Sequence, residues 1–206
     1  MTRFSTVLAP VALVAAVALA APAFPAAHVG QPAPDFVAAD TSGKPVKLSS
    51  FRGKTVVLEW NNPGCPFVQK HYNSGNMQKT QDAAVQQGVV WLTINSGAPG
   101  KQGYMTGAEA IAFEKSEKAK ATAYLLDPKG IVGKLYDAKT TPHMYVIDPK
   151  GTLVYAGAID DKPTADPDDI KTANNLVLSA LADMKAGKPV AVATSKPYGC
   201  SVKYAS

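Results

Sequence analysis

The 206-residue chain has little arginine, and few of its residues are charged. Arg3 and Arg52 are its only arginines, and scattered lysines leave a net charge of +5. Because nucleic-acid sites usually combine clustered basic residues with aromatic side chains, this sparse pattern argues against a nucleic-acid partner. Charged residues make up 18% of the chain and hydrophobic residues 46%, which is typical of a globular domain and not of a disordered chain.

The longest apolar run lies at the N-terminus and is short for a membrane span. Arg3 precedes an alanine-rich run over residues 7–20, and Ala-Pro-Ala at 21–23 fits a cleavage site for a signal peptidase. Residues 1–23 are therefore predicted to be a signal peptide, with an uncleaved anchor as the alternative. We expect the mature protein to be secreted or periplasmic, with no stable insertion in a membrane.

Cysteine is also scarce, since only Cys65 and Cys200 occur. Val68 stands three residues after Cys65, so a self-contained C-x-x-C dithiol is excluded. In an oxidising compartment the one possible intramolecular disulfide joins Cys65 to Cys200. A Cys200 that stays free or packs separately is the alternative.

Buried strands and helices alternate along the chain. Residues 55–60 and 88–96 are apolar and β-branched, as expected for strands that are covered on both faces. A glycine-rich stretch over 97–107 is interpreted as a surface loop. The remaining expectations are two short N-terminal strands around the turn at 40–44, helices over 66–87, 106–120, 130–138 and 166–187, a strand near 123–126 and a hairpin over 140–161.

This order predicts an α/β fold: a central mixed sheet with one antiparallel section, helices on both faces and an N-terminal β extension. One domain is expected over residues 30–186. Residues 187–206 then form a C-terminal tail that carries Cys200.

Several stretches together resemble the peroxiredoxin-like branch of the thioredoxin-like superfamily, the alkyl hydroperoxide reductase and thiol-specific antioxidant (redoxin) group. They are GQPAPDF, DTSGKPVKLSSFRGKTVVLEW, GCPFV, TPHMYVIDPKGTLVYAGAIDD and KPYGCSVKY. The resemblance implies a three-layer thioredoxin-like fold. It also implies that Cys65 is the nucleophilic thiol and that Pro142, which follows Thr141, is the cis-proline that faces it.

The setting of Cys65 favours a reactive thiol. Gly64 and Pro66 place it at the turn into the helix over 66–87, where free backbone N–H groups and the helix dipole stabilise a thiolate and lower the thiol pKa. A buried, inert cysteine is the alternative. Cys65 and Cys200 are the candidate redox residues, with Pro142 and Thr141 beside them.

Two departures from the family argue against efficient peroxidase chemistry. The residue three positions before Cys65 is Asn62, where peroxiredoxins carry threonine or serine. No arginine follows Arg52, so none comes from a later strand to polarise a peroxide. The sequence thus favours thiol-disulfide exchange with a protein or small-molecule substrate. A weak peroxidase and a non-catalytic metal- or protein-binding module remain as alternatives.

Three further side chains are candidates for supporting roles. Glu59 and Trp60 end the strand before Cys65, and Glu59 either accepts protons near the site or faces solvent. His143 follows Pro142 and is expected either to pair with Cys65, as a thiolate–imidazole couple or a weak metal site, or to lie at the surface like His71. No cofactor and no resident metal are expected.

Overall fold

The computed structural model describes Met1 and residues 26–205, so nearly all of the predicted signal peptide lies outside the described residues. Nine strands are present in the described part of the chain. They are β1 (Val37–Asp40), β2 (Pro45–Lys47), β3 (Val56–Trp60), β4 (Val90–Asn95), β5 (Ala123–Leu126), β6 (Thr140–Thr141), β7 (His143–Ile147), β8 (Leu153–Gly157) and β9 (Cys200–Ser201).

Five α-helices and two 3₁₀ turns connect these strands. The helices are α1 (Pro66–Asn73), α2 (Asn76–Val85), α3 (Gly107–Ser116), α4 (Ile131–Leu135) and α5 (Leu176–Lys185). The 3₁₀ turns are η1 (Leu48–Phe51) and η2 (Pro167–Lys171).

Seven strands form one mixed sheet in the order β2-β1-β5-β4-β3-β7-β8. β3, β4 and β5 run parallel to one another, whereas β7 and β8 continue the sheet in antiparallel fashion. β1 and β2 pair with each other and extend the other edge, which is the expected N-terminal β extension. The predicted α/β fold with a mixed central sheet and flanking helices is therefore confirmed.

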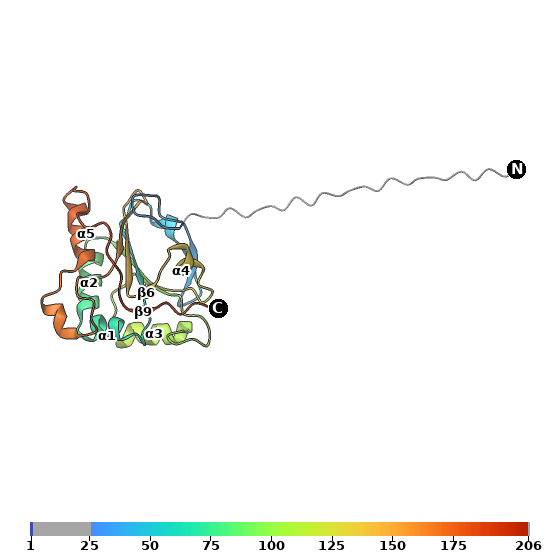
Figure 1. Ribbon diagram of the computed structural model, residues 1–206, viewed down its shortest axis with the longest axis horizontal. Coiled ribbons are helices and arrows are strands. Elements are labelled where there is room, and N and C mark those ends of the chain that lie inside the picture. Colours follow the sequence, from blue (N-terminus) through green and yellow to red (C-terminus); the bar gives the residue numbers. More distant parts are fainter. Residues whose placement is uncertain (2–25, 206) are drawn as a thin grey trace.

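The two faces of the sheet carry separate cores because successive side chains of a strand point to opposite sides. On β3, Val56, Leu58 and Trp60 join the core that α4 covers, while Val57 joins the core that α1, α2 and α5 cover. Figure 1 shows α2 and α5 on one side of the sheet and α4 on the other, with α1 and α3 at the end where β6 and β9 lie. Cys65 belongs to the core of α1, α2 and α5.

Three helices differ from the sequence prediction. The expected helix over 66–87 is two helices, because the chain turns at Gly75, whose φ of +74° is left-handed. α3 starts where predicted, with a reciprocal hydrogen-bonded cap between Thr106 and Glu109, but it ends at Ser116, and Lys118 has a φ of +54°.

The expected last helix over 166–187 is also interrupted. Residues 167–171 form only η2, and α5 begins at Leu176, where the side chain of Asn175 accepts a hydrogen bond from the N–H of Leu178. Asp166, Asp168 and Asp169 were expected in the first turn of this helix. They lie instead at the start of η2, which Asp166 caps, and the first turn of α5 holds no acidic residue.

Candidate functional site

Cys65 occupies the N-cap of α1, directly after the turn that follows β3. Its N–H donates to the carbonyl of Asn62 at 3.0 Å, and the side-chain oxygen of Asn62 accepts from the N–H of Gly64 at 2.9 Å. Pro66 fills the first helical position, where a missing N–H costs nothing. None of the surface of Cys65 is exposed to solvent. A polar turn therefore holds the cysteine at the start of the helix.

Thr141 and Pro142 lie against this thiol. The peptide bond between them is cis, which is the isomer expected from the sequence. The Cys65 Sγ donates a hydrogen bond to the backbone carbonyl of Thr141 at 3.1 Å. Thr141 and Pro142 are both buried, and β7 begins directly after Pro142. The sequence thus brings the loop before β7 to the start of α1.

Cys200 reaches the same place from the far end of the chain. β9 pairs with β6 in antiparallel register, with Cys200 opposite Thr141. The Thr141 hydroxyl donates to the carbonyl of Cys200 at 3.4 Å, and Cys200 packs against the core cluster that contains Cys65. Both cysteines are free thiols in this structure, and Cys200 is only partly buried. The tail therefore folds back over the site instead of extending away from it.

The pKa values of the two thiols are shifted in opposite directions. Burial alone raises the pKa of Cys65, but hydrogen bonds from the side chains of Cys200 and Thr141 and from the N–H of Val68 outweigh it, so the pKa of Cys65 is lowered. The pKa of Cys200 is raised to about 11, mainly by burial and further by the hydrogen bond and charge of Cys65. Cys65 is therefore the thiol that ionises first, and it is the thiol at the helix N-terminus.

A buried polar network anchors the tail just before Cys200. The Tyr198 hydroxyl donates to Asp160 and contacts His71 Nε2 at 3.2 Å. The Lys70 ammonium lies 3.8 Å from the second oxygen of Asp160 and 5.5 Å from the centre of the Tyr198 ring. Lys70, His71 and Asp160 are almost fully buried. Sequence reasoning missed the roles of Tyr198 and Asp160, for which the only signal was that both lie in stretches shared with the family.

Close backbone contact fixes the tail at Gly199. Its φ is +132°, and a Cβ atom there would lie 2.1 Å from the carbonyl oxygen of Thr141. A side chain at this position cannot be accommodated without moving β9 away from β6. Gly199 is thus required for the pairing that places Cys200 beside Cys65.

Glu59 is a fully buried carboxylate, so the alternative that it faces solvent is wrong. It accepts hydrogen bonds only from uncharged groups, and burial raises its pKa. The donors are Trp91 Nε1 at 2.8 Å, the Tyr72 hydroxyl at 2.9 Å, Gln81 Nε2 at 3.0 Å, the Thr93 hydroxyl at 3.2 Å and Asn61 Nδ2 at 3.3 Å. These contacts connect β3 to α1, α2 and β4, close to the turn over residues 62–65, which is called the cysteine turn.

Trp60 and His143 point to the other face of the sheet. Trp60 packs against Tyr136 and Tyr145 and donates from Nε1 to the hydroxyl of Ser96 at 3.0 Å. His143 lies over Tyr145, whose hydroxyl is 3.0 Å from the histidine Nδ1. Cys65 packs in the opposite core, so these contacts give no support to a pairing of His143 with the thiol.

The expectation that both histidines of the domain lie at the surface is wrong. His71 is fully buried and His143 is 6% exposed. Burial lowers the pKa of His143 to about 4, and burial together with the charge of Lys70 lowers the pKa of His71 to about 3. Both imidazoles are therefore neutral near pH 7.

The glycine-rich stretch 97–107 is more than a surface loop. Asn62 Nδ2 donates to the side-chain oxygen of Gln102 at 2.8 Å, and a Cβ at Gly103 would collide with Asn62. At the start of the loop, Ala98 is buried and its N–H donates to the carbonyl of Lys203 at 2.8 Å. The loop thus makes hydrogen bonds to both the cysteine turn and the tail.

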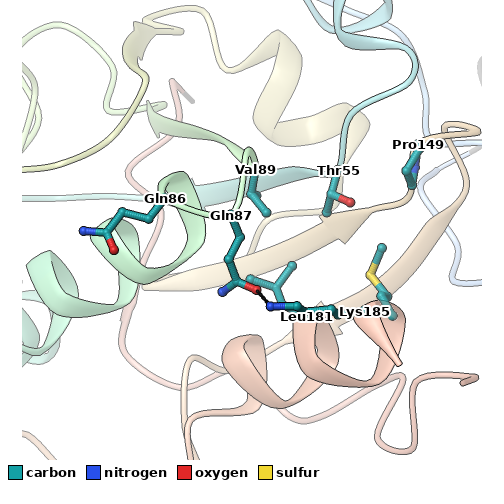
Figure 2. A pocket seen from close by; sticks show the side chains of 8 residues that line it. Thr55, Gln86, Gln87, Val89, Pro149, Leu181 and Lys185 are labelled. Carbon is teal, nitrogen blue, oxygen red and sulfur yellow. Dashed lines mark hydrogen bonds between the residues drawn. The ribbon is translucent and has the colours of Figure 1, made fainter. Parts of the chain in front are cut away.

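Two cavities are of similar size but differ in their relation to the thiols. One of about 460 Å³ lies at the opposite end of the sheet, between the start of β3 and α5, as Figure 2 shows with Thr55, Val89 and Leu181. The other, of about 470 Å³, lies along the tail and includes Tyr198 and Gly199 in its lining. Neither cysteine lines either cavity, but the lining of the second includes the two residues that precede Cys200 in the chain.

Neither a metal cluster nor a membrane helix is found in the described part of the chain. Among these residues, no three histidine, cysteine or acidic side chains are grouped so as to hold a metal ion. No helix formed by them is long and apolar enough to cross a membrane.

Comparison with known proteins identifies the family of this chain. The sequence profile of the AhpC/TSA family matches residues 29–156, more than half of the chain. The chain belongs to the AhpC/TSA family. This membership and the mixed sheet place it in the thioredoxin-like superfamily, as the sequence resemblance predicted.

Three relatives illustrate the similarity. The chain is 28% identical over 127 residues to the thiol-disulfide oxidoreductase ResA of Bacillus subtilis. The match covers 61% of this chain and 64% of ResA. The chain thus spans less than two thirds of the length of this curated relative. It is 25% identical to a candidate thiol:disulfide interchange protein DsbE from Chlorobium tepidum (TM-score 0.52, 64% of this chain and 85% of that chain).

A hypothetical protein of Sinorhizobium meliloti 1021 is similar over more of the chain. The TM-score is 0.73 at 24% identity, and the match covers 88% of this chain and 97% of that chain. This similarity extends the shared fold to most of the described residues.

Proposed function

We propose that this chain is an exported thiol-disulfide oxidoreductase in which Cys65 is the nucleophile and Cys200 its redox partner. The observation that carries the proposal is that Thr141, next to the cis Pro142, contacts the Cys65 thiol and pairs with Cys200. The similarity to ResA and DsbE, which are named for thiol-disulfide chemistry, supports the reaction class.

Cys200 takes the place of the missing second cysteine of a C-x-x-C motif. In the dithiol state, the Cys65 thiolate attacks one sulfur of a substrate disulfide and expels the other as a thiolate. The Cys200 thiol then loses its proton and attacks Cys65, which releases the reduced substrate and leaves a Cys65–Cys200 disulfide. Run in reverse, the same steps oxidise a substrate dithiol. The substrate is a protein or small molecule that contains a disulfide or thiols.

A peroxidase is the less favoured function because, among the residues that the structure describes, no guanidinium lies near the thiol. Arg52 donates to the carbonyl of Lys150 at 3.0 Å, in the loop that precedes β3 and at the opposite end of that strand from Cys65. Asn62, which replaces the usual threonine or serine, is engaged with Gly64 and Gln102. Hydrogen peroxide should therefore oxidise Cys65 slowly and without turnover.

Export is proposed from residues 1–23, which have the form of a signal peptide. An extracytoplasmic protein meets an oxidising environment, in which a two-cysteine couple can be kept oxidised by partner disulfides. N-terminal sequencing of the protein recovered from the periplasm or medium tests this. A mature chain that starts shortly after residue 23 supports export, and an intact Met1 in the cytoplasmic fraction contradicts it.

The activity is tested by reduction of insulin disulfides with dithiothreitol as electron donor. We expect the wild-type protein to accelerate the reaction and Cys65→Ser to reduce the rate to background. Cys200→Ser should form a mixed disulfide with insulin that persists, because its internal partner is gone. Unchanged activity in Cys65→Ser would contradict the proposed nucleophile, and rapid peroxide turnover by the wild-type protein would favour the peroxidase instead.

A further inference from the structure

The shape of the cysteine turn depends on one residue, Asn62. The carbonyl of Asn62 accepts a hydrogen bond from the N–H of Cys65 at 3.0 Å, and its side-chain oxygen accepts from the N–H of Gly64 at 2.9 Å. Pro63, the remaining residue of the turn, has no N–H. Asn62 therefore accepts from every N–H between itself and α1, as asparagine side chains and carbonyls commonly do in turns.

Gln102, in the glycine-rich stretch 97–107, holds the amide of Asn62 from its other end. Asn62 Nδ2 donates to Gln102 Oε1 at 2.8 Å, and Gln102 Nε2 donates back to Asn62 Oδ1 at 3.4 Å. A reversed Asn62 amide would set donor against donor at Gly64 and acceptor against acceptor at Gln102 Oε1. Without the Gln102 side chain, only the bond to Gly64 and a long contact of 3.5 Å to the Gln102 carbonyl would remain.

Two glycines let these amides meet. The Gln102 amide lies directly over Gly64, where a Cβ would be 2.2 Å from Nε2. The backbone of Gly103, whose φ is +83°, comes so close to Asn62 that a Cβ there would be 2.1 Å from Oδ1. The glycine-rich stretch is therefore fitted to the cysteine turn by the absence of side chains at both places.

The loop that carries Gln102 is fixed to the sheet. Asn95 ends β4, and its Nδ2 donates to the carbonyl of Gly103 at 2.8 Å, while its Oδ1 accepts from the N–H of Gly97 at 2.9 Å. β4 pairs with β3, and the cysteine turn follows β3. The same two strands therefore place Gln102 and the turn that it contacts.

We propose that Gln102 is a positioning residue for the Cys65 nucleophile and acts through the amide of Asn62. This inference rests on the proposed function and adds to it a residue, distant in the chain, that keeps the reacting sulfur in place. Cys65 Sγ lies at the start of α1, 3.1 Å from the carbonyl oxygen of Thr141. A cysteine turn released by the loss of Gln102 would let the sulfur leave this position.

Both exchange steps should slow when the sulfur is displaced. Cys65 Sγ attacks the substrate disulfide, and Cys200 later attacks the same atom, so each step needs this sulfur in alignment. The start of α1 also stabilises the thiolate, so a displaced sulfur ionises at higher pH. A residue that contributed only to the stability of the fold would change neither the rate nor the ionisation.

Three variants of the full chain test the inference. Gln102→Ala removes the side chain, Gln102→Met keeps its length without the amide, and Asn62→Ala removes the group through which it acts. We expect each to slow the formation of the Cys65–Cys200 disulfide by oxidised glutathione about ten-fold, measured by quenching with N-ethylmaleimide and mass spectrometry. Gln86→Ala is the matched control and should react like the wild-type protein, because this exposed glutamine lines the cavity at the opposite end of the sheet.

The double variant with Asn62→Ala and Gln102→Ala tests the route. Since Gln102 acts through Asn62, the double variant should be as slow as either single variant, within about two-fold. Independent effects would instead multiply to about 100-fold and overturn the proposed route. A wild-type rate in Gln102→Met would also overturn it, because the cover over Gly64 and not the amide pair would then matter.

A second readout does not depend on the disulfide. In a Cys200→Ser background Cys65 is the only thiol, and its alkylation by iodoacetamide is followed against pH. We expect the midpoint to lie at higher pH with Gln102→Ala than without it, and circular dichroism establishes that both proteins are folded. An unchanged midpoint overturns the inference and leaves the redox couple intact. If the wild-type protein forms no Cys65–Cys200 disulfide, the proposed couple fails, while the midpoint still decides for or against Gln102.

Discussion

Cys65 lies where a buried central strand meets a helix, whereas Cys200 lies in a tail that contains only a two-residue strand. The position of Cys65 is fixed by the end of β3 and by its place as the N-cap of α1, so many contacts of the core hold it. The position of Cys200 depends on a few contacts, chiefly those of Tyr198 and Gly199. Single substitutions in the tail should therefore separate the two sulfurs while the domain stays folded.

The largest effect is expected from Gly199→Ala. The new methyl group would overlap the carbonyl of Thr141 and force β9 away from β6. We expect the Cys65–Cys200 disulfide to form about 100-fold more slowly, since a displacement of about 1 Å is enough to cost that much in reactions that depend on alignment. Stopped alkylation during oxidation by oxidised glutathione measures the rate.

Gly187→Ala is the matched control for this substitution. Gly187 also has a positive φ, +67°, but a Cβ there meets no atom within 4 Å. We expect a loss of about 1 kcal/mol in the free energy of unfolding from backbone strain and no change in the rate of disulfide formation. Equal slowing in both variants would show that strain anywhere in the tail, and not the contact at Thr141, governs the rate.

A smaller effect is expected from Tyr198→Phe. The substitution removes the hydroxyl that donates to buried Asp160 and contacts His71. Loss of a hydrogen bond to a buried charged group should lower the free energy of unfolding by about 1–3 kcal/mol. Urea denaturation measures this, and disulfide formation should slow as the tail loosens.

Tyr204→Phe is the comparison at the far end of the tail. The Tyr204 hydroxyl donates only to the neutral carbonyl of Ala138, at 2.8 Å. We expect a loss of about 1 kcal/mol or less and an unchanged rate of disulfide formation. If the two phenylalanine variants behave alike, the buried network around Asp160 has no special part in placing Cys200.

The last effect concerns pH and involves two buried histidines, His71 beside Tyr198 and His143 in the opposite core. His71 and His143 stay neutral in the folded protein until about pH 3 and 4, while unfolded histidines take up a proton below about 6.5. Stability from each is present above pH 6.5 and is lost as the pH falls toward those values, by at most about 1.4 kcal/mol per pH unit.

Urea denaturation at pH 7, 6 and 5 tests this linkage. The free energy of unfolding should fall with decreasing pH, and His71→Asn should show a shallower slope than the wild-type protein. The readout is the slope and not the stability itself, so the loss of the contact with Tyr198 does not confuse it. Identical slopes would mean that His71 is protonated in the folded protein near pH 6.

The contrast between the two cysteines also explains what the sequence could predict. Runs of apolar, β-branched residues and a proline directly after Cys65 are local sequence signals. For this reason β3, β4 and the start of α1 were predicted correctly. The break at Gly75 was missed because the whole segment 66–87 was taken as one helix. The late start of α5 was missed because the acidic residues at 166, 168 and 169 suit the first turn of a helix. The contacts that place Cys200 join residues far apart in the chain, such as Tyr198 with Asp160 and His71, and no local pattern encodes them.

Buried polar side chains were the hardest to assign from the sequence. Glu59 and His71 are charged or titratable residues whose burial depends on partners from several elements. The sequence indicates only that such residues interrupt apolar runs, which fits a surface position equally well. The contacts of Asn62 with the glycine-rich loop were missed for the same reason.

The most direct test of the proposed couple is non-reducing peptide mapping of the mature protein after equilibration with oxidised and reduced glutathione. We predict a cross-linked peptide that joins Cys65 to Cys200, which disappears as the buffer becomes more reducing and is the only product in oxidising buffer. Recovery of both cysteines as separate thiols or separate glutathione adducts under oxidising conditions would contradict the redox couple.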